Sequence, residues 1–189
     1  MQETRPIYEF LLAQEVYPNN LIICDEDVLQ RAINLFKNCQ YKVSLIAFES
    51  INEKMHDSPD LEHKACILNN LACAHFKNGN YLQAYSLLKK SLGVLPNTSN
   101  TENTIKIYIN LASLANEIAD IKEVESYLNK ALDLVSTLDG PKNDFFCAIY
   151  DEFGVLYRES VKCSEAIPFF EKALQYAMHN TPRQSLNTP

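Results

Sequence analysis

Three side chains that could bind a metal ion lie close together in the sequence: His63, Cys66 and Cys73. On a helix, offsets of three and ten residues would place them nearly on one face, where they could share a zinc ion. A zinc site of this kind needs a fourth ligand nearby, and the helical position between the two cysteines is Asn70. We therefore predict that no metal binds here and that both thiols are packed or line a binding groove.

Other signs of catalysis are weak. The four histidines do not form an HExxH pattern, and the sequence has no glycine-rich phosphate loop. His75 falls on an apolar stripe, which is more typical of a packed, hydrogen-bonded histidine than of a general base. We expect no catalytic residue, no cofactor and a non-enzymatic protein. The six cysteines are scattered without a CxxC pair, which predicts free thiols in a reducing compartment.

The elements that would position these side chains are helices. Between residues 68 and 92 two apolar periodicities with helical spacing flank a single Asn-Gly-Asn turn at Gly79. Glycine suits the left-handed conformation that often ends a helix. This stretch predicts two antiparallel helices, and a lone pair of this size would be marginally stable.

The same hairpin recurs about every 40 residues. Its first helix carries a small residue in one column, preceded four residues earlier by a larger apolar one. The small residues are Ala32, Ala72, Ala112 and Gly154, and their larger partners are Val28, Leu68, Tyr108 and Tyr150. The second helix has Ser44, Ala84, Val124 and Ala166, followed four residues later by Phe48, Leu88, Leu128 and Phe170. Small residues facing large ones let helices pack closely, so each hairpin would bury its remaining apolar face on its neighbours.

These columns resemble the tetratricopeptide repeat, most clearly at Leu68, Leu71-Ala72, Gly79-Asn80-Tyr81, Ala84, Leu88 and Pro96. The period is nearer 40 than the usual 34, a length that also suits HEAT or armadillo units, but the Gly-x-Tyr-x-x-Ala core favours the tetratricopeptide reading. The runs LNNLA and EAIPFFEKAL are similar to the long repeats of kinesin light chains. The resemblance implies an all-α, right-handed superhelical solenoid of about four antiparallel helix hairpins, with ligands bound on a concave face lined by the first helices.

Turn-rich connectors set the expected boundaries of the array. We expect repeats at about residues 25–58, 62–97, 102–138 and 144–180. Residues 1–24 would form an N-terminal covering segment, in which residues 6–17 could form a short helix over the first repeat. The polar tail, residues 181–189, is expected to be disordered.

The first-helix stripe opposite the core is expected to be exposed. It includes Ile33, Cys66, Cys73 and Ser113 besides its polar members. Carried over from the tetratricopeptide family, the polar ladder along the groove is Gln30, Asn70, Asn110 and Glu152. A carboxamide both donates to and accepts from a peptide backbone, which suits an extended ligand. The alternative is an ordinary solvated helix face.

The end of this stripe changes charge along the array, running Lys37, Lys77, Glu117, Glu159. This order predicts a ligand that is acidic toward the N-terminal repeats and basic toward the C-terminal ones. The lysine and arginine clamp with which some tetratricopeptide grooves bind chaperone tails is missing, since the corresponding positions hold residues such as Asn69, Cys73, Ala148 and Glu152. We do not expect chaperone-tail binding.

The last predicted helix, residues 164–178, has apolar residues beyond its core stripe: Ile167, Phe169, Leu174 and Tyr176. Such a patch predicts an interface with another copy, a partner or a further segment of a longer protein. The alternative is that the tail folds back over these side chains, or that they lean into the preceding repeat.

The net charge of −7 argues against a nucleic-acid partner, and no apolar run is long enough to insert into a membrane. With no basic and apolar leader at the start, the chain is expected to be soluble and cytoplasmic. The main hypothesis is an adaptor that captures an extended peptide of a protein partner in its groove. The alternative is a scaffold subunit of a larger assembly or homo-oligomer that uses repeat ends and convex faces.

Overall fold

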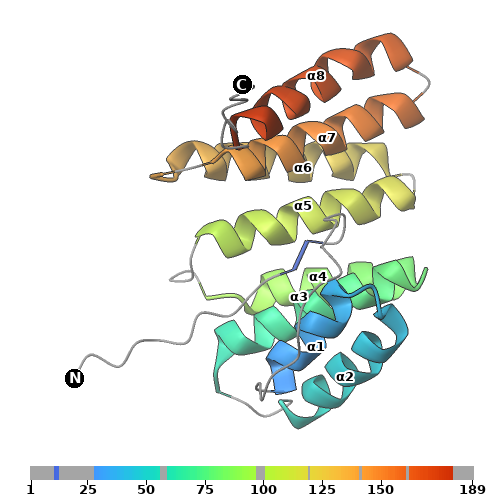
Figure 1. Cartoon of the computed structure of the whole chain (residues 1–189), viewed down its shortest axis with the longest axis vertical. Helices are drawn as coiled ribbons and strands as arrows, with labels where there is room; N and C mark the ends of the chain where they lie inside the picture. The colour runs from blue at the N-terminus through green and yellow to red at the C-terminus, as the bar shows by residue number, and fades with distance from the viewer. Residues whose placement is uncertain are drawn as a thin grey trace, which may run out of the picture.

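The computed structural model of the chain describes residues 11–12, 28–55, 59–96, 101–118, 120–140, 142–160 and 162–180. These residues form eight α-helices and no strand, arranged as four consecutive hairpins (Figure 1). The hairpins are α1 (Val28–Lys37) with α2 (Tyr41–Lys54), α3 (Leu61–Lys77) with α4 (Tyr81–Val94), α5 (Thr101–Glu117) with α6 (Ile121–Thr137), and α7 (Asn143–Glu159) with α8 (Cys163–Asn180). The predicted all-α helical solenoid is confirmed.

Local sequence signals fix where the helices begin and turn. The Asp60 carboxylate caps α3 by accepting from the backbone N–H of His63 at 2.9 Å, and Asp120 caps α6 in the same way through Glu123. Gly79, in the turn after α3, has a φ of 80°, in the left-handed region that glycine adopts without strain. The turn at Gly79 and the cap at Asp120 thus lie where the chain reverses after α3 and after α5.

The hairpins stack because each second helix also packs against the first helix of the next hairpin. The predicted small residues lie at the close contacts: Ala32, Ala72 and Ala112 are completely buried. In the fourth hairpin, a Cβ atom added to Gly154 would lie 2.5 Å from the Phe170 ring of α8. Only glycine leaves room for that ring, so the small-residue column sets the helix spacing.

Two serines in alanine-like positions are also satisfied inside the core. The Ser44 hydroxyl donates to the Ala32 carbonyl oxygen at 3.1 Å, and the Ser91 hydroxyl donates to the Ala65 carbonyl oxygen at 2.7 Å. Because buried hydroxyls need a partner, these bonds between the two helices of a hairpin make serine acceptable at the contact.

The first hairpin departs from the expected pattern. Val28, predicted in the core, is 58% exposed, whereas Ile33, predicted on the exposed stripe, is buried. Val28 begins α1 at the end of the array, and no described hairpin packs on that side of it. None of the helices in the described ranges is long and apolar enough to cross a membrane.

Candidate peptide-binding site

Leu11 lies outside the helices, and its backbone is held by three asparagine side chains. The Leu11 N–H donates to Asn70 Oδ1 at 2.9 Å. Its carbonyl oxygen accepts from Asn69 Nδ2 at 3.0 Å and from Asn110 Nδ2 at 2.9 Å. The short described piece that contains Leu11 and Leu12 runs between α3 and α5 (Figure 1). Both polar groups of one peptide residue are therefore satisfied by side chains from two adjacent repeats.

The asparagine cluster, which we define as Asn69, Asn70 and Asn110, is also bonded internally. Asn69 Nδ2 donates to Asn70 Oδ1 at 3.0 Å, and Asn110 Nδ2 donates to Asn69 Oδ1 at 2.9 Å. All three side chains are buried, with exposed fractions of 0–1%. Burying an unpaired amide is costly, so these mutual bonds keep the carboxamides aligned toward the backbone of Leu11.

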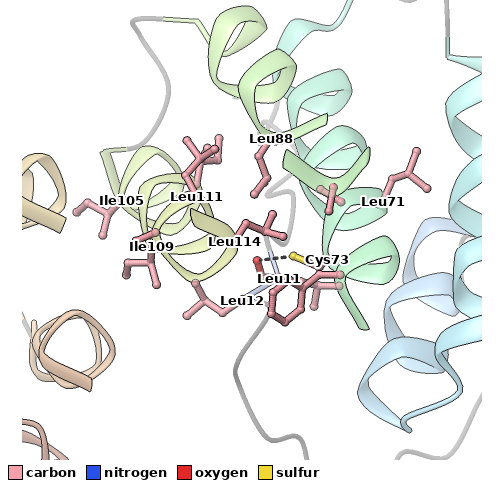
Figure 2. Packing of buried hydrophobic residues seen from close by; sticks show 14 of the residues in the cluster. Leu11, Leu12, Leu71, Cys73, Leu88, Ile105, Ile109, Leu111 and Leu114 are labelled. Carbon is pink, nitrogen blue, oxygen red and sulfur yellow. Dashed lines mark hydrogen bonds between the residues drawn. The ribbon is translucent and has the colours of Figure 1, made fainter. Parts of the chain in front are cut away.

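The two thiols singled out in the sequence line this cluster. The Cys73 thiol lies 3.5 Å from the Leu11 carbonyl oxygen and points toward it in Figure 2. Asn110 Nδ2 contacts Cys73 Sγ, and Asn70 Nδ2 contacts Cys66 Sγ, both at 3.5 Å. Cys66 and Cys73 are thus buried, free thiols of a polar cluster, and nowhere in the described part of the chain do three potential metal ligands gather.

His75 is the packed, hydrogen-bonded histidine that its position predicted. It is buried, and its Nδ1 lies 3.3 Å from Asn80 Nδ2 in the turn after α3. Burial lowers the pKa of the imidazole, and the nearby carboxylate of Glu49 opposes that change. The neutral ring therefore joins the turn to the helix.

The predicted exposed stripe is largely buried, which corrects the sequence-based interpretation. Asn70, Asn110 and Glu152 have exposed fractions of at most 3%, and Cys66 and Cys73 are also covered. The first helices contact one another, α3 with α5 and α5 with α7, and Leu11 covers the junction of α3 and α5. The face of the first helices that was predicted to be exposed is thus largely an interior face, although Asn70, Asn110 and Glu152 on it are polar.

The ladder does not continue through the first and fourth repeats. Gln30 is half-buried and donates to Asn34 Oδ1 within α1 at 3.3 Å. Glu152 accepts from the Ser113 hydroxyl and from Asn116 Nδ2, the latter at 2.9 Å, and so ties α7 to α5. Of the four predicted ladder residues, the structure brings only Asn70 and Asn110 to the backbone of the same residue, Leu11.

Glu152 is buried without a cation among its hydrogen-bond partners. Burial raises the pKa of its carboxyl from 4.5 to about 7, and the bonds from Ser113 and Asn116 oppose this increase. The carboxyl therefore titrates near neutral pH while it connects two repeats. This makes the α5–α7 junction sensitive to pH in a way that the asparagine cluster is not.

The charged ends of the stripe lie at the surface in two places. Glu117 and Glu159 are exposed and line a pocket of about 400 Å³ between α5 and α7, in which Arg158 bonds to Glu159 at 3.0 Å. Lys77 is half-buried at the end of α3, with its ammonium 5.9 Å from the centre of the Tyr41 ring. The structure thus brings the two glutamates together and keeps Lys77 apart from them.

The N-terminal segment differs from its prediction where it is described. Leu11 and Leu12 are not helical, and the hydrogen bonds described for Leu11 reach the second and third hairpins, whereas the prediction placed this segment over the first. The other residues of the predicted segment, like the tail at 181–189, lie outside the described residues. The side chains of Leu11 and Leu12 are almost fully buried and belong to the main apolar cluster, next to Leu114 in Figure 2.

The predicted patch at the C-terminal end is only partly present. Phe169 and Tyr176 are half-buried because they stack on aromatic rings of α7: Phe169 lies 5.0 Å from Tyr157, and Tyr176 lies 4.9 Å from Phe146, between ring centres. Ile167 is exposed as predicted. The exposed apolar face of α8 consists of Ile167, Leu174 and Met178, the last of which the sequence prediction missed.

Sequence reasoning also missed Leu11 and the role of Asn69. Two signals point to them. Asn69 and Asn70 are adjacent in a helix although asparagine is a mediocre helix former, and the run Phe10-Leu11-Leu12 is apolar within a polar N-terminal stretch. Neither signal identifies the contact, because the partners are 59 residues apart in the chain.

Comparisons with known proteins agree with this architecture. A family model described as the tetratricopeptide repeat matches residues 63–137. Two curated relatives, the DnaJ homolog subfamily C member 7 of Mus musculus and that of Homo sapiens, are each 24% identical over 173 residues, which cover 86% of this chain. The chain spans only 30% of the length of these relatives.

A solved structure shows the same fold. The crystal structure of BtubC (BKLC) from P. vanneervenii matches with a TM-score of 0.65 at 16% sequence identity, covering 88% of this chain and 73% of that chain. Residues 63–137 thus match the tetratricopeptide repeat, and the stacked hairpins have the fold of this solved structure.

Proposed function

We propose that this chain is a non-enzymatic adaptor that binds an extended segment of a partner protein at the asparagine cluster. Tetratricopeptide repeats generally mediate protein–protein interaction. One observation supports the more specific site: Asn70 and Asn110 bond the N–H and the carbonyl oxygen of the same residue, Leu11. Such bonds recognise a backbone and not a side chain, so many sequences can satisfy them.

The charged residues give the ligand a direction. Glu117 and Glu159 line one pocket at the ends of α5 and α7, while Lys77 ends α3. A partner segment that is acidic toward the N-terminal repeats and basic toward the C-terminal ones would complement both ends. The buried free thiols Cys66 and Cys73 suit a reducing compartment such as the cytoplasm.

A random-peptide library tests this function. Phage-displayed dodecapeptides are selected against the full chain, both as wild type and as a segment variant carrying Leu11→Asp and Leu12→Asp, so that the chain's own residues do not compete. Selected peptides are then synthesised and titrated by fluorescence anisotropy. We expect binding to depend on the asparagine cluster.

The decisive comparison is between the peptide affinity of the segment variant and that of the same variant carrying Asn70→Ala and Asn110→Ala. Each lost hydrogen bond costs about 1 kcal/mol, so affinity should fall about thirtyfold. Gln30→Ala is the matched control because Gln30 bonds only within α1 among the contacts described. Peptides that bind equally well after loss of both asparagines, or a selection that fails with both chains, would contradict the proposal.

A scaffold subunit is the second candidate, favoured by the exposed apolar face of α8. Every earlier second helix packs on the first helix of a following hairpin, whereas Ile167, Leu174 and Met178 are each more than half exposed. Sedimentation velocity of the wild type and of Ile167→Glu with Leu174→Glu tests it. A scaffold that uses this face should self-associate as wild type and be monomeric as the variant; a monomeric wild type at high concentration contradicts self-assembly.

A further inference from the structure

The Leu11–Leu12 segment occupies the asparagine cluster as a bound peptide would. Besides the backbone bonds of Leu11, both leucine side chains are buried between α3 and α5, with exposed fractions of 0% and 7%. Figure 2 shows them among Leu114 and Ile109 of α5 and Cys73 of α3. The site that we assign to a partner is therefore filled by the chain itself.

We infer, on the basis of the function proposed above, that the Leu11–Leu12 segment is an internal ligand. It occupies the asparagine cluster until a partner segment with two adjacent apolar residues displaces it. The partner class follows from the occupant: an extended stretch whose backbone meets Asn69, Asn70 and Asn110 and whose two neighbouring side chains are apolar. Binding of a partner is thus an exchange, and the free chain is self-inhibited.

Another peptide residue could make the same hydrogen bonds as Leu11, so that no buried group of the helices would lose its partner. Asn69, Asn110 and Cys73 donate to the Leu11 carbonyl oxygen, and Asn70 accepts from its N–H. All four side chains belong to the helices, and every residue other than proline supplies the same backbone N–H and carbonyl oxygen. An incoming segment can therefore satisfy each buried amide, which an empty site could not do.

The contacts between consecutive hairpins do not involve this segment. Consecutive hairpins contact one another directly through α2 with α3, α4 with α5 and α6 with α7. The small-residue columns that set these contacts lie within the helices, at Ala32, Ala72 and Ala112. Displacement of Leu11 would open one polar cluster while leaving the helix contacts in place.

The apolar character of the partner follows from the burial of both leucines. At positions that are at most 7% exposed, a charged side chain would lose its hydration without a compensating ion. A single apolar residue would fill only half of the space that Leu11 and Leu12 occupy. Two adjacent apolar residues are the shortest sequence that fits both positions.

The expected strength of inhibition follows from tethering. A ligand on the same chain acts at an effective concentration in the millimolar range, so a peptide with micromolar intrinsic affinity should bind the wild type about 10²–10³-fold more weakly than an open site. We set the threshold for the test at a tenfold difference.

The probe is a fluorescein-labelled synthetic peptide of residues 6–17, PIYEFLLAQEVY, titrated by fluorescence anisotropy. The proteins are the full wild-type chain and the segment variant, Leu11→Asp with Leu12→Asp. We expect the variant to bind the peptide at least tenfold more tightly than the wild type. A control protein with Ile46→Asp and Leu82→Asp, at strongly exposed positions of α2 and α4, should bind it like the wild type. Equal affinities of the wild type and a folded segment variant would overturn the inference.

A second measurement uses only the wild type, in case the segment variant does not fold. Hydrogen exchange of the Leu11 amide is followed by mass spectrometry with and without a saturating amount of the same peptide carrying ¹³C-labelled leucines. Exchange should accelerate at least tenfold when the added peptide displaces Leu11 from Asn70. Unchanged exchange under saturation would show a permanent structural strap and overturn the inference.

These outcomes separate the inference from the proposed function. If library peptides bind through Asn70 and Asn110 but bind the wild type and the segment variant equally, the function stands and self-inhibition fails. If no peptide depends on those asparagines in either chain, the function itself fails. Tighter binding by the segment variant, lost again on Asn70→Ala with Asn110→Ala, supports both.

Discussion

The buried carboxyl of Glu152 predicts a stability that falls as pH rises toward neutrality. Its pKa is about 7 in the folded chain and 4.5 as the ordinary value, because burial disfavours the charged form. Between these two pH values the folded chain retains a proton that the unfolded chain has lost. The free energy of unfolding therefore decreases as pH rises through this range, and the decrease is complete above pH 7.

The size of this effect follows from the same two values. A pKa that moves from 4.5 to about 7 corresponds to about 3 kcal/mol, a large fraction of the stability of a domain of this size. Below pH 4.5 both states are protonated, and the contribution of Glu152 to stability is fully present. The cost at higher pH is that of an ionised carboxylate held by Ser113 and Asn116 inside the array.

Glu152→Gln isolates this effect. The amide keeps the size of the side chain and an acceptor oxygen for Ser113 or Asn116, but it cannot ionise. Urea unfolding followed by circular dichroism at pH 4.5, 6, 7 and 8 should show the wild type losing about 3 kcal/mol relative to the variant across the series. Other titrating groups are common to both chains and cancel in the difference.

Glu159→Gln is the matched control, because the Glu159 side chain is 61% exposed. Its difference from the wild type in free energy of unfolding should not change with pH. If the difference between wild type and Glu152→Gln were also independent of pH, the carboxyl would not be desolvated in the folded chain. The placement of Glu152 as a buried link between α5 and α7 would then be wrong.

Two further predictions concern packing and charge. Gly154→Ala should lower the free energy of unfolding by about 1–3 kcal/mol, because the new Cβ would lie 2.5 Å from the Phe170 ring. Gly93→Ala, whose new Cβ meets nothing within 4 Å, should raise it by about 0.5–1 kcal/mol. Urea unfolding of the two variants should therefore give changes of opposite sign relative to the wild type. Glu117→Lys with Glu159→Lys should weaken the binding of library-selected peptides that carry basic residues and reduce its dependence on salt. Anisotropy titrations at two salt concentrations measure this, and an unchanged salt dependence would exclude the two glutamates from the site.

The fold could be predicted from the sequence because its determinants repeat. Ala32, Ala72 and Ala112 recur in one column, and each is buried at a helix contact. In a solenoid every repeat packs on copies of itself, so the partner of a helix face is contained in the same periodic pattern. Local signals such as Gly79 then place the turns.

The candidate site could not be predicted to the same depth, because its partner does not repeat. A polar stripe with Asn70 and Asn110 is typical of a solvated face when only helical periodicity is considered. These residues are buried because Leu11, 59 residues before Asn70, supplies an N–H and a carbonyl oxygen to them. Similarly, Phe169 and Tyr176 lie outside the core stripe of α8, but their rings reach aromatic partners on α7.

The chemistry of one column explains why, among the described residues, the backbone of Leu11 is bonded in the middle of the array. Asn70 and Asn110 occupy equivalent positions in consecutive repeats, and a short carboxamide there can both donate to and accept from the same peptide residue. At the equivalent position of the first repeat, the longer Gln30 bonds to Asn34 in its own helix. In the fourth repeat, the Glu152 carboxyl instead accepts two bonds from α5 and so is engaged within the array. The outer repeats therefore use this column for structure, and the α3–α5 junction is the place where the array has a backbone-recognising surface.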